Sequence, residues 1–340
     1  ITCADAGSQV VTCTVISGTP LTASSTIIMT GITSYYVGST DVTLLEIEDE
    51  GVAANDIATD TSVAMTDITA ADAAASVALG AATVGATGDV TLTLTSTVQL
   101  DADDTIDVTF PAYMNVSSVA SAVTGTFENG GEITCADAGS QVVTCTVISG
   151  APLLSSGTIV MTGITSYYVG TTDIIALEIE DEGSASNDIA TDTSTALTDI
   201  TAADAAATIV VAAPTVGGVG DVTVTLTTTV ATDADDTLDI TFPAFMDISS
   251  VASAVTGTLE NGGEITCVDA GSQVVTCTVI SGSPLLSSGT IIMTGISSLY
   301  IGSTDVTVLE IEDEGASAND IATDTSTALT DITAADAAAT

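Results

Sequence analysis

The residues with the clearest chemical potential are glutamates that alternate along a predicted strand. Glu178, Glu180 and Glu182 lie two residues apart. Because successive side chains of a strand point to opposite faces, all three are expected on one face, where like charges repel. The chain contains no Lys, Arg or His, so no internal salt bridge can relieve that repulsion. The adjoining loop adds further oxygen donors, which are Asn187, Asp188 and Asp192.

This acidic strand predicts a calcium site, because calcium in proteins takes carboxylate, amide and backbone oxygens as ligands. Tandem extracellular domains of the cadherin kind offer an analogy, in which calcium held by acidic loops stiffens the domain junctions. The strand cluster occurs twice more, as Glu46, Glu48, Glu50, Asn55, Asp56 and Asp60, and as Glu310, Glu312, Glu314, Asn319, Asp320 and Asp324. A second candidate cluster is the turn Asp101, Asp103 and Asp104, with its copy Asp233, Asp235 and Asp236.

The same carboxylates have a simpler interpretation as a solvated acidic surface that keeps the chain soluble. Salt screens such surface charges beyond about 8 Å at physiological ionic strength. Aspartate in a turn also needs no metal to explain it, because its side chain bonds to nearby backbone groups. The sequence leaves both interpretations open.

Six cysteines form three pairs, Cys3 with Cys13, Cys135 with Cys145, and Cys267 with Cys277. The arms ITCAD and VVTCTV flank ADAGSQ, so a hairpin centred near Ser140 places the two sulfur atoms of a pair opposite each other. The inward neighbours Ile133, Val143 and Val147 put this disulfide partly in the core. A metal-binding pair would need more ligands than a repeat without His offers. Because disulfides persist in oxidising compartments, the protein is expected to be extracellular, either secreted or on a cell surface.

The composition argues against catalysis. Without His or Lys, the chain can form no Ser-His-Asp or Cys-His arrangement and no Schiff base. Paired carboxylates could hydrolyse glycosides, but the chain has no Trp, only 6 Tyr and 4 Phe to stack on sugars. No enzymatic activity is expected.

The elements that position these residues are predicted to be strands. Val90, Leu92 and Leu94 alternate with threonines, which is typical of a strand with one buried face. Clusters such as GATGD, ENGGE and EDEG punctuate the strands at the spacing of a sandwich. The sequence therefore predicts an all-β protein of tandem immunoglobulin-like β-sandwiches, with about seven to nine strands and one disulfide in each repeat.

The pattern repeats with a long, constant period. The string ITCADAGSQVVTCTVISG begins at Ile1 and Ile133 and returns with one substitution at Ile265, so the period is 132 residues. A unit of this size can bury its own core. The stretch AADAAA is interpreted as a turn or linker, which predicts the C-terminal half of a repeat over residues 1–74 and complete repeats over 75–206 and 207–340.

The charge and hydropathy of the chain exclude several kinds of partner and of structure. The formal net charge is −45, and 46% of residues are hydrophobic. Nucleic acids and anionic membrane surfaces are excluded as partners because both require basic residues. Disorder is excluded because disordered chains combine high charge with low hydrophobicity. No stretch approaches the roughly 18 apolar residues of a membrane span, so direct membrane insertion is not expected.

The order of these motifs resembles a known class of repeats. The segments GDVTLTLTSTVQLDADDTIDVTFPAYM, VTCTVISG, IVMTGITS and LEIEDEG are similar to immunoglobulin-like repeats of giant secreted surface proteins, which include bacterial adhesins and extracellular fibres or coats. This resemblance implies a stalk, fibre or coat component. The absence of basic residues departs from typical members.

Three functions are consistent with the sequence. The first is a structural filament, fibre or coat, stiffened by calcium, in which like subunits or neighbouring repeats are the partners. The second is the stalk of an adhesin whose binding head lies elsewhere. The third is a module that binds glycans. Asn115, in Asn-Val-Ser, is a candidate glycosylation site, although the next repeat has Asp247 at that position.

Overall fold

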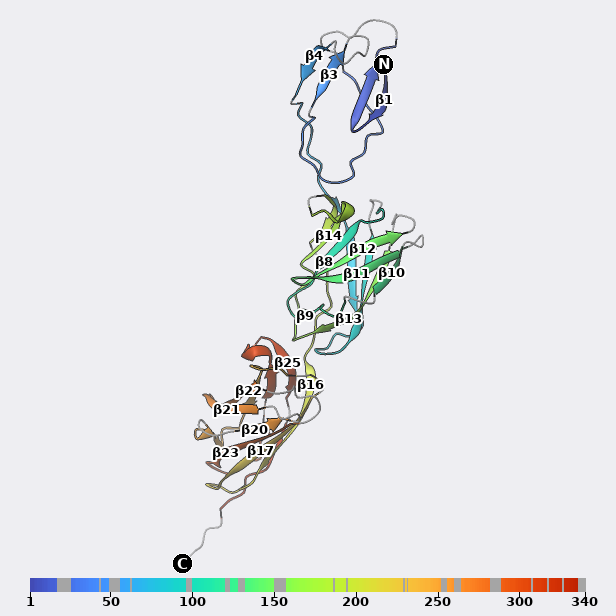
Figure 1. Ribbon diagram of the computed structural model, residues 1–340. Coiled ribbons are helices and arrows are strands. Elements are labelled where there is room, and N and C mark those ends of the chain that lie inside the picture. Colours follow the sequence, from blue (N-terminus) through green and yellow to red (C-terminus); the bar gives the residue numbers. More distant parts are fainter. Residues whose placement is uncertain are drawn as a thin grey trace, which may run out of the picture.

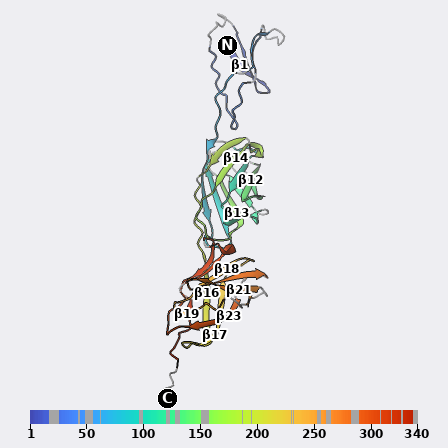
Figure 2. The same cartoon turned by 90° about the vertical axis from the view of Figure 1, so that its left-hand side faces the viewer.

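The computed structural model is an elongated rod of three units, with the two termini at opposite ends in both views (Figures 1 and 2). Apart from single turns of 3-10 helix, the regular elements of the described residues are strands. The structure describes residues 1–16, 26–42, 44–48, 56–61, 63–95, 100–119, 123–127, 132–149, 157–185, 187–193, 195–228, 230, 232–251, 256–259, 264–281, 289–306, 308–316, 318–325 and 327–335.

The first unit contains two separate strand pairs. Strands β1 and β2 form one antiparallel hairpin, and β3 and β4 form another. No described residue of this unit belongs to the buried apolar core, which begins at Ala73. The strands are β1 (Thr2–Gly7), β2 (Val10–Thr14), β3 (Leu45–Glu48) and β4 (Asp56–Asp60).

The second unit is a complete β-sandwich of the immunoglobulin-like class. Nine of its described strands have four or more residues, which confirms the predicted fold and strand number. The elements are β5 (Ala71–Asp72), β6 (Ala74–Leu79), β7 (Gly88–Thr95), β8 (Thr105–Thr109), β9 (Met114–Asn115), β10 (Val123–Phe127), β11 (Glu132–Gly139), β12 (Val142–Ser149), β13 (Gly157–Ser166), β14 (Ala176–Glu180), η2 (Asp181–Gly183) and β15 (Asp188–Asp192).

The core of this unit lies between two layers of strands. Neighbours pair in the order β5-β15-β14-β8-β12-β11-β10-β13-β7-β6. Alternate side chains of β7, such as Leu92 and Leu94, are fully buried, as are Ile106 of β8 and Ile179 of β14. The threonines between them lie on the outer face or are only partly buried. Period-two alternation therefore sets which face of each strand enters the core.

The third unit repeats this arrangement. Strand β16 pairs with β25 at its start and with β17 along the rest, and β17 also pairs with β23, so the strand circuit closes. A closed circuit leaves no long free edge for another sheet to extend. The elements are β16 (Ala203–Val211), β17 (Val219–Thr228), β18 (Thr237–Thr241), β19 (Met246–Asp247), β20 (Thr256–Leu259), β21 (Glu264–Gly271), β22 (Val274–Ser281), β23 (Gly289–Ser298), β24 (Val308–Glu312), η4 (Asp313–Gly315), β25 (Asp320–Asp324) and β26 (Ala328–Leu329).

The predicted hairpin disulfides are present in all three units. Cys135 and Cys145 lie directly opposite each other in β11 and β12, and both are buried. The turn at Ser140 and Gln141 has positive φ at both residues. The side-chain amide of Gln141 donates to the carbonyl oxygens of Pro111 and Met114, at 2.9 and 2.6 Å. The disulfide hairpin is thus also tied to the end of the loop after β8, a contact that the sequence did not predict.

The interpretation of AADAAA as a turn or linker is wrong, because this stretch forms the first part of β16. Alanine is a weak strand former, but Ala203 and Ala205 are buried, and pairing with β25 holds the segment extended. Strand pairing of the second unit likewise begins at Ala71. The expected junctions after residues 74 and 206 consequently fall within the strand-paired starts of the second and third units.

Candidate functional site

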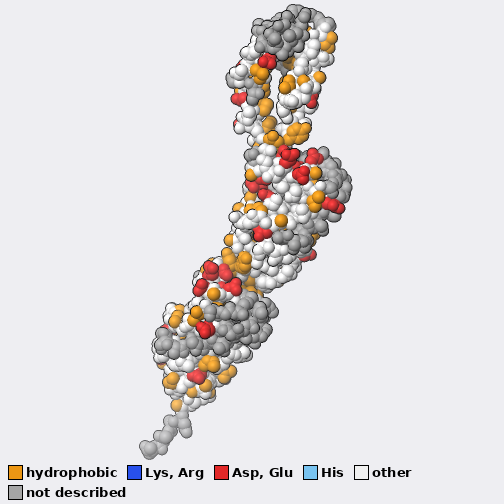
Figure 3. Space-filling view, viewed as in Figure 1, with side chains coloured by type: hydrophobic (Ala, Val, Ile, Leu, Met, Phe, Trp, Pro, Cys, Tyr) orange, Lys and Arg blue, Asp and Glu red, His pale blue; other side chains and the backbone are white. Residues whose placement is uncertain are grey.

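The two acidic clusters predicted from the sequence meet at one end of each complete repeat. The carboxylate of Asp104 accepts hydrogen bonds from the backbone N–H of Asp101 at 2.7 Å and of Glu182 at 3.1 Å. Asp104 is buried and so links the turn before β8 to the turn η2 after β14. In Figure 3, Asp and Glu side chains gather at the end of the second and third units that faces the preceding unit.

Glu178 and Glu180 share one face of β14, as predicted, but Glu182 does not. The strand ends at Glu180, and Glu182 lies in η2 with a φ of 50°, so the alternation stops before it. Glu180 is buried and accepts a hydrogen bond from the Thr105 hydroxyl at 3.4 Å.

Asp107 of β8 completes this acidic face. It lies opposite Glu178 in the pairing of β8 with β14, and its Oδ1 atom is buried without a hydrogen-bond partner among the described residues. Asp107 was not among the predicted site residues. The pairing of strands about 70 residues apart, which brings it to Glu178, has no local signal.

The third unit reproduces the site. Asp236 accepts from the backbone N–H of Asp233 at 2.6 Å and of Glu314 at 3.1 Å, and Thr237 donates to Glu312 at 3.3 Å. Asp239 takes the place of Asp107, again with a buried and unpartnered Oδ1. The two complete repeats therefore have the same arrangement of acidic residues.

Burial raises the pKa of these carboxyl groups. Removal from water is the main cause at Asp104 and Asp236, where backbone hydrogen bonds oppose it in part. At Glu180 the same effect raises the pKa, with further contributions from the charges of Asp107 and Glu178. At Glu312 burial and the charge of Asp239 act in the same direction. Holding these groups ionised at neutral pH therefore costs folding free energy.

The other candidate ligands have different surroundings. Asp192 accepts from the buried hydroxyl of Thr195 at 3.0 Å, as Asp324 does from Thr327. The backbone carbonyl of Asn187 accepts from Asp181 at 3.1 Å, and that of Asn319 accepts from Asp313 at 3.0 Å. Asp103 and Asp235 have positive φ in their turns. Glu46, Glu48, Asp56 and Asp60 lie in β3 and β4, and Glu50 and Asn55 lie outside the described residues.

Within the described part of the chain, no three Cys, Asp or Glu side chains converge as a ready metal site. The carboxylates share one end of the repeat, but Asp104, Glu180 and Asp192 bond to the backbone and to hydroxyl groups. Calcium binding thus stays a prediction that would require these side chains to turn toward a common point.

Asn115 has a structural role that its counterpart shares. Its Oδ1 accepts from the backbone N–H of Ser117 at 3.1 Å and from the Ser117 hydroxyl at 2.7 Å. Asp247 makes the same two bonds to Ser249, at 3.1 and 2.7 Å. Because either side chain can accept these two bonds, Asn and Asp can both occupy this position. Glycosylation of Asn115 stays a prediction.

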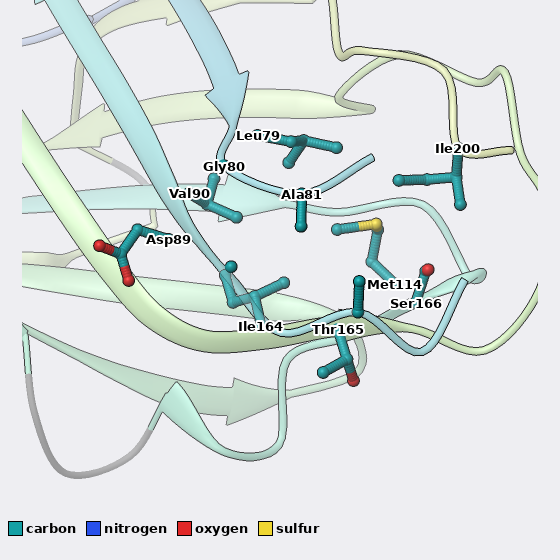
Figure 4. Close-up of a pocket in the computed structure, with 12 residues that line it drawn as sticks. Leu79, Gly80, Ala81, Asp89, Val90, Met114, Ile164, Thr165, Ser166 and Ile200 are labelled. Carbon is teal, nitrogen blue, oxygen red and sulfur yellow. The ribbon is translucent and has the colours of Figure 1, made fainter. Parts of the chain in front are cut away.

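One small pocket opens at the opposite end of the second unit (Figure 4). Its walls are mostly apolar or backbone, and the carboxylate of Asp89 points away from Val90 and Met114. Ser166 lines it, but no basic residue exists in the chain to activate a hydroxyl. The pocket contains no pair of groups for nucleophilic or acid–base catalysis.

Comparisons with known proteins provide little further information about this chain. No protein-family model and no curated protein sequence matches the chain. Among solved structures, the chain is similar to a type II cohesin dyad from the adaptor ScaA scaffoldin of Acetivibrio cellulolyticus, with 9% identity and a TM-score of 0.20 over 72% of this chain and 89% of that one. A likeness of this strength supports no conclusion about function. The described residues include no helix long and apolar enough to cross a membrane.

Proposed function

We propose that the chain is a structural segment of an extracellular filament, fibre or surface coat, in which sandwich repeats are joined end to end. The observation that carries this proposal is the direction of the first and last strands of a repeat. Strand β5 runs parallel to β15, with Ala71 beside Ala190, and Thr83 pairs in the same direction with Thr201. A repeat therefore begins at one end of the sandwich and finishes at the other, so each added repeat lengthens the rod.

The disulfides and the surface chemistry support the same function. Three hairpin disulfides, two of them buried, suit an oxidising, extracellular compartment. We propose no catalytic role, since a chain without His, Lys or Arg and with identical acidic ends in successive repeats fits a load-bearing element better. Neighbouring repeats are the partners that this geometry favours.

Small-angle X-ray scattering on a series of chains tests the proposal. Residues 203–340 can follow Ala334 in register, because Ala334 occupies the position of Ala202. Each added repeat should increase the maximum dimension by the same amount. A maximum dimension that stays nearly constant as repeats are added would contradict an end-to-end array.

The alternative is the stalk of an adhesin, which would use the same rod to hold a binding head away from the surface. Sedimentation and electron microscopy separate the two. Lateral or end-to-end association of purified chains into ordered fibres supports a filament, whereas rods that stay single and bear a distinct terminal domain in native material support a stalk. Retention on polysaccharide columns would instead support a glycan-binding module.

Calcium stiffening is the second part of the proposal. The acidic face of Asp107, Glu178 and Glu180 lies near the preceding repeat, because Asp188, which pairs with Glu180, accepts from Val37 N–H at 3.0 Å through its backbone carbonyl. Calcium should raise the melting temperature relative to EDTA, and the double variant Asp107→Asn with Asp239→Asn should lose that rise. Asp247→Asn, in β19 of the third unit, is the control. Equal melting in calcium and in chelator would leave a solvated acidic surface as the explanation.

A further inference from the structure

The two junctions between repeats use the same contact, 132 residues apart. Val37 N–H donates to the carbonyl of Asp188 at 3.0 Å, and Val169 N–H donates to the carbonyl of Asp320 at 3.0 Å. Both are backbone hydrogen bonds between successive repeats, and they join equivalent atoms. One surface at the end of a repeat therefore meets one surface at the start of the next.

The junction between the second and third repeats also has an apolar part. A Cβ atom built on Gly85 would lie 3.2 Å from Cγ2 of Val230, which belongs to the third repeat and is buried. Tyr168 lies next to the acidic turn η4, since burial first and then the charges of Asp313 and Glu314 raise its pKa. Gly85, Tyr168 and Val169 together form what we term the end surface of the second repeat.

The third repeat has the same end surface, and no described residue covers it. A Cβ on Gly217 meets no atom within 4 Å. Tyr300 and Ile301 are 52% and 61% exposed, whereas their equivalents Tyr168 and Val169 are partly buried. The surface is nevertheless already formed, because Tyr300 packs on Phe245 with ring centroids 6.3 Å apart, as Tyr168 packs on Tyr113 at 6.4 Å.

We propose that Gly217, Tyr300 and Ile301 form a docking surface for the start of a further copy of the same repeat. The partner is defined by continuity with the existing junction. It would present a valine like Val230, an acidic turn like η4 and a strand that begins like β25. Such a head-to-tail contact uses two different surfaces, so it can be repeated from one repeat to the next. The inference rests on the proposed end-to-end array and specifies the contact that fixes its geometry.

Tyrosine modification tests this docking surface directly. In the 340-residue chain, tetranitromethane should nitrate Tyr300 faster than Tyr168, as read by mass spectrometry after cleavage at acidic residues. In the chain extended by residues 203–340 after Ala334, with the added copy of Tyr300 changed to Phe so that the two peptides differ, the Tyr300 rate should fall to that of Tyr168. An unchanged Tyr300 rate in the extended chain would overturn the proposal.

A matched pair of variants separates docking from folding. Gly85 and Gly217 both have positive φ, 70° and 74°, which Asn tolerates better than most residues. Gly85→Asn should collide with Val230 and broaden the distribution of distances between the second and third repeats, measured by single-molecule energy transfer. Gly217→Asn should leave that distribution unchanged in the 340-residue chain and broaden the new junction of the extended chain.

The outcomes distinguish this inference from the array itself. If the extended chain scatters as a longer rod but Gly85→Asn changes no distance distribution, the docking surface is wrong and the array stands. If the extended chain gains no length, both the end-to-end array and the docking surface are contradicted. Equal melting temperatures of Gly85→Asn and Gly217→Asn would show that backbone strain does not cause the difference between their distance distributions.

Discussion

Residues 1–70 and residues 133–202 have nearly the same sequence but very different surroundings. Leu177 in the complete repeat is fully buried, whereas its equivalent Leu45 is 45% exposed. The difference lies in β8, which pairs with β12 on one side and with β14 on the other. In residues 1–70 the equivalents of β12 and β14 are β2 and β3, which pair only with β1 and β4. Correct local patterning is thus not enough to bury a core without the central strand.

The largest effect is expected from adding a strand equivalent to β8 to residues 1–70. A copy of residues 71–132 placed before Ile1 would supply a strand like β8 between β2 and β3. Burying each exposed Val, Leu or Ile would stabilise the unit by about 1.5–3 kcal/mol. Hydrogen exchange at β1 to β4 should slow to the level of β11 to β15. The same extension with its copies of Ile106 and Val108 changed to Asp is the control, and equally slow exchange there would contradict this prediction.

A smaller effect is expected from one core substitution made in both regions. Leu177→Ala should lower the free energy of unfolding by about 2–5 kcal/mol, because it removes a fully buried side chain. Leu45→Ala should change it by less than about 0.5 kcal/mol, as at other exposed positions. Urea denaturation of the two variants measures the difference. Equal losses would mean that Leu45 is buried in solution.

The disulfides offer a similar contrast of smaller size. Replacing Cys135 and Cys145 by Ala should cost about 2–3 kcal/mol, since a bond that closes a short loop restrains the unfolded chain by about that amount. Replacing Cys3 and Cys13 should leave the melting of the complete repeats unchanged, because β1 and β2 contribute nothing to their core. Calorimetry of both double variants gives the comparison, and identical melting curves would show that the hairpin bond adds no stability.

The smallest expected effect is a dependence on pH that is confined to the complete repeats. The pKa values of Glu180 and Glu312 are raised by burial, so the folded state binds protons more tightly than the unfolded state. Stability should therefore be highest below the unfolded-state glutamate pKa of about 4.3 and fall as pH rises through the raised pKa values. Glu180→Gln with Glu312→Gln should flatten the curve of urea midpoint against pH. Asp103→Asn, in an exposed turn, is the control, and a stability that falls on acidification would contradict the assignment.

Much of this protein was determined by the sequence alone. The 132-residue period follows directly from the repeated string, and the alternation of β7 and β14 and the pairing of Cys135 with Cys145 depend on residues near one another along the chain. Such local patterns fix which face of a strand is buried and which residues of a hairpin meet. The β-sandwich class and the disulfides could be predicted for that reason.

Only the tertiary structure decided how the acidic residues and the repeat ends are arranged. Asp104 bonds to the backbone of Glu182, 78 residues away, and Asp107 meets Glu178 because β8 lies between β12 and β14. Composition and spacing contain no signal for such pairings, since they depend on the order of strands in the sheet. The junction of Val169 with Asp320 is likewise set by which ends of the sandwich hold the termini. Periodicity therefore specified the unit, and strand order specified how units meet.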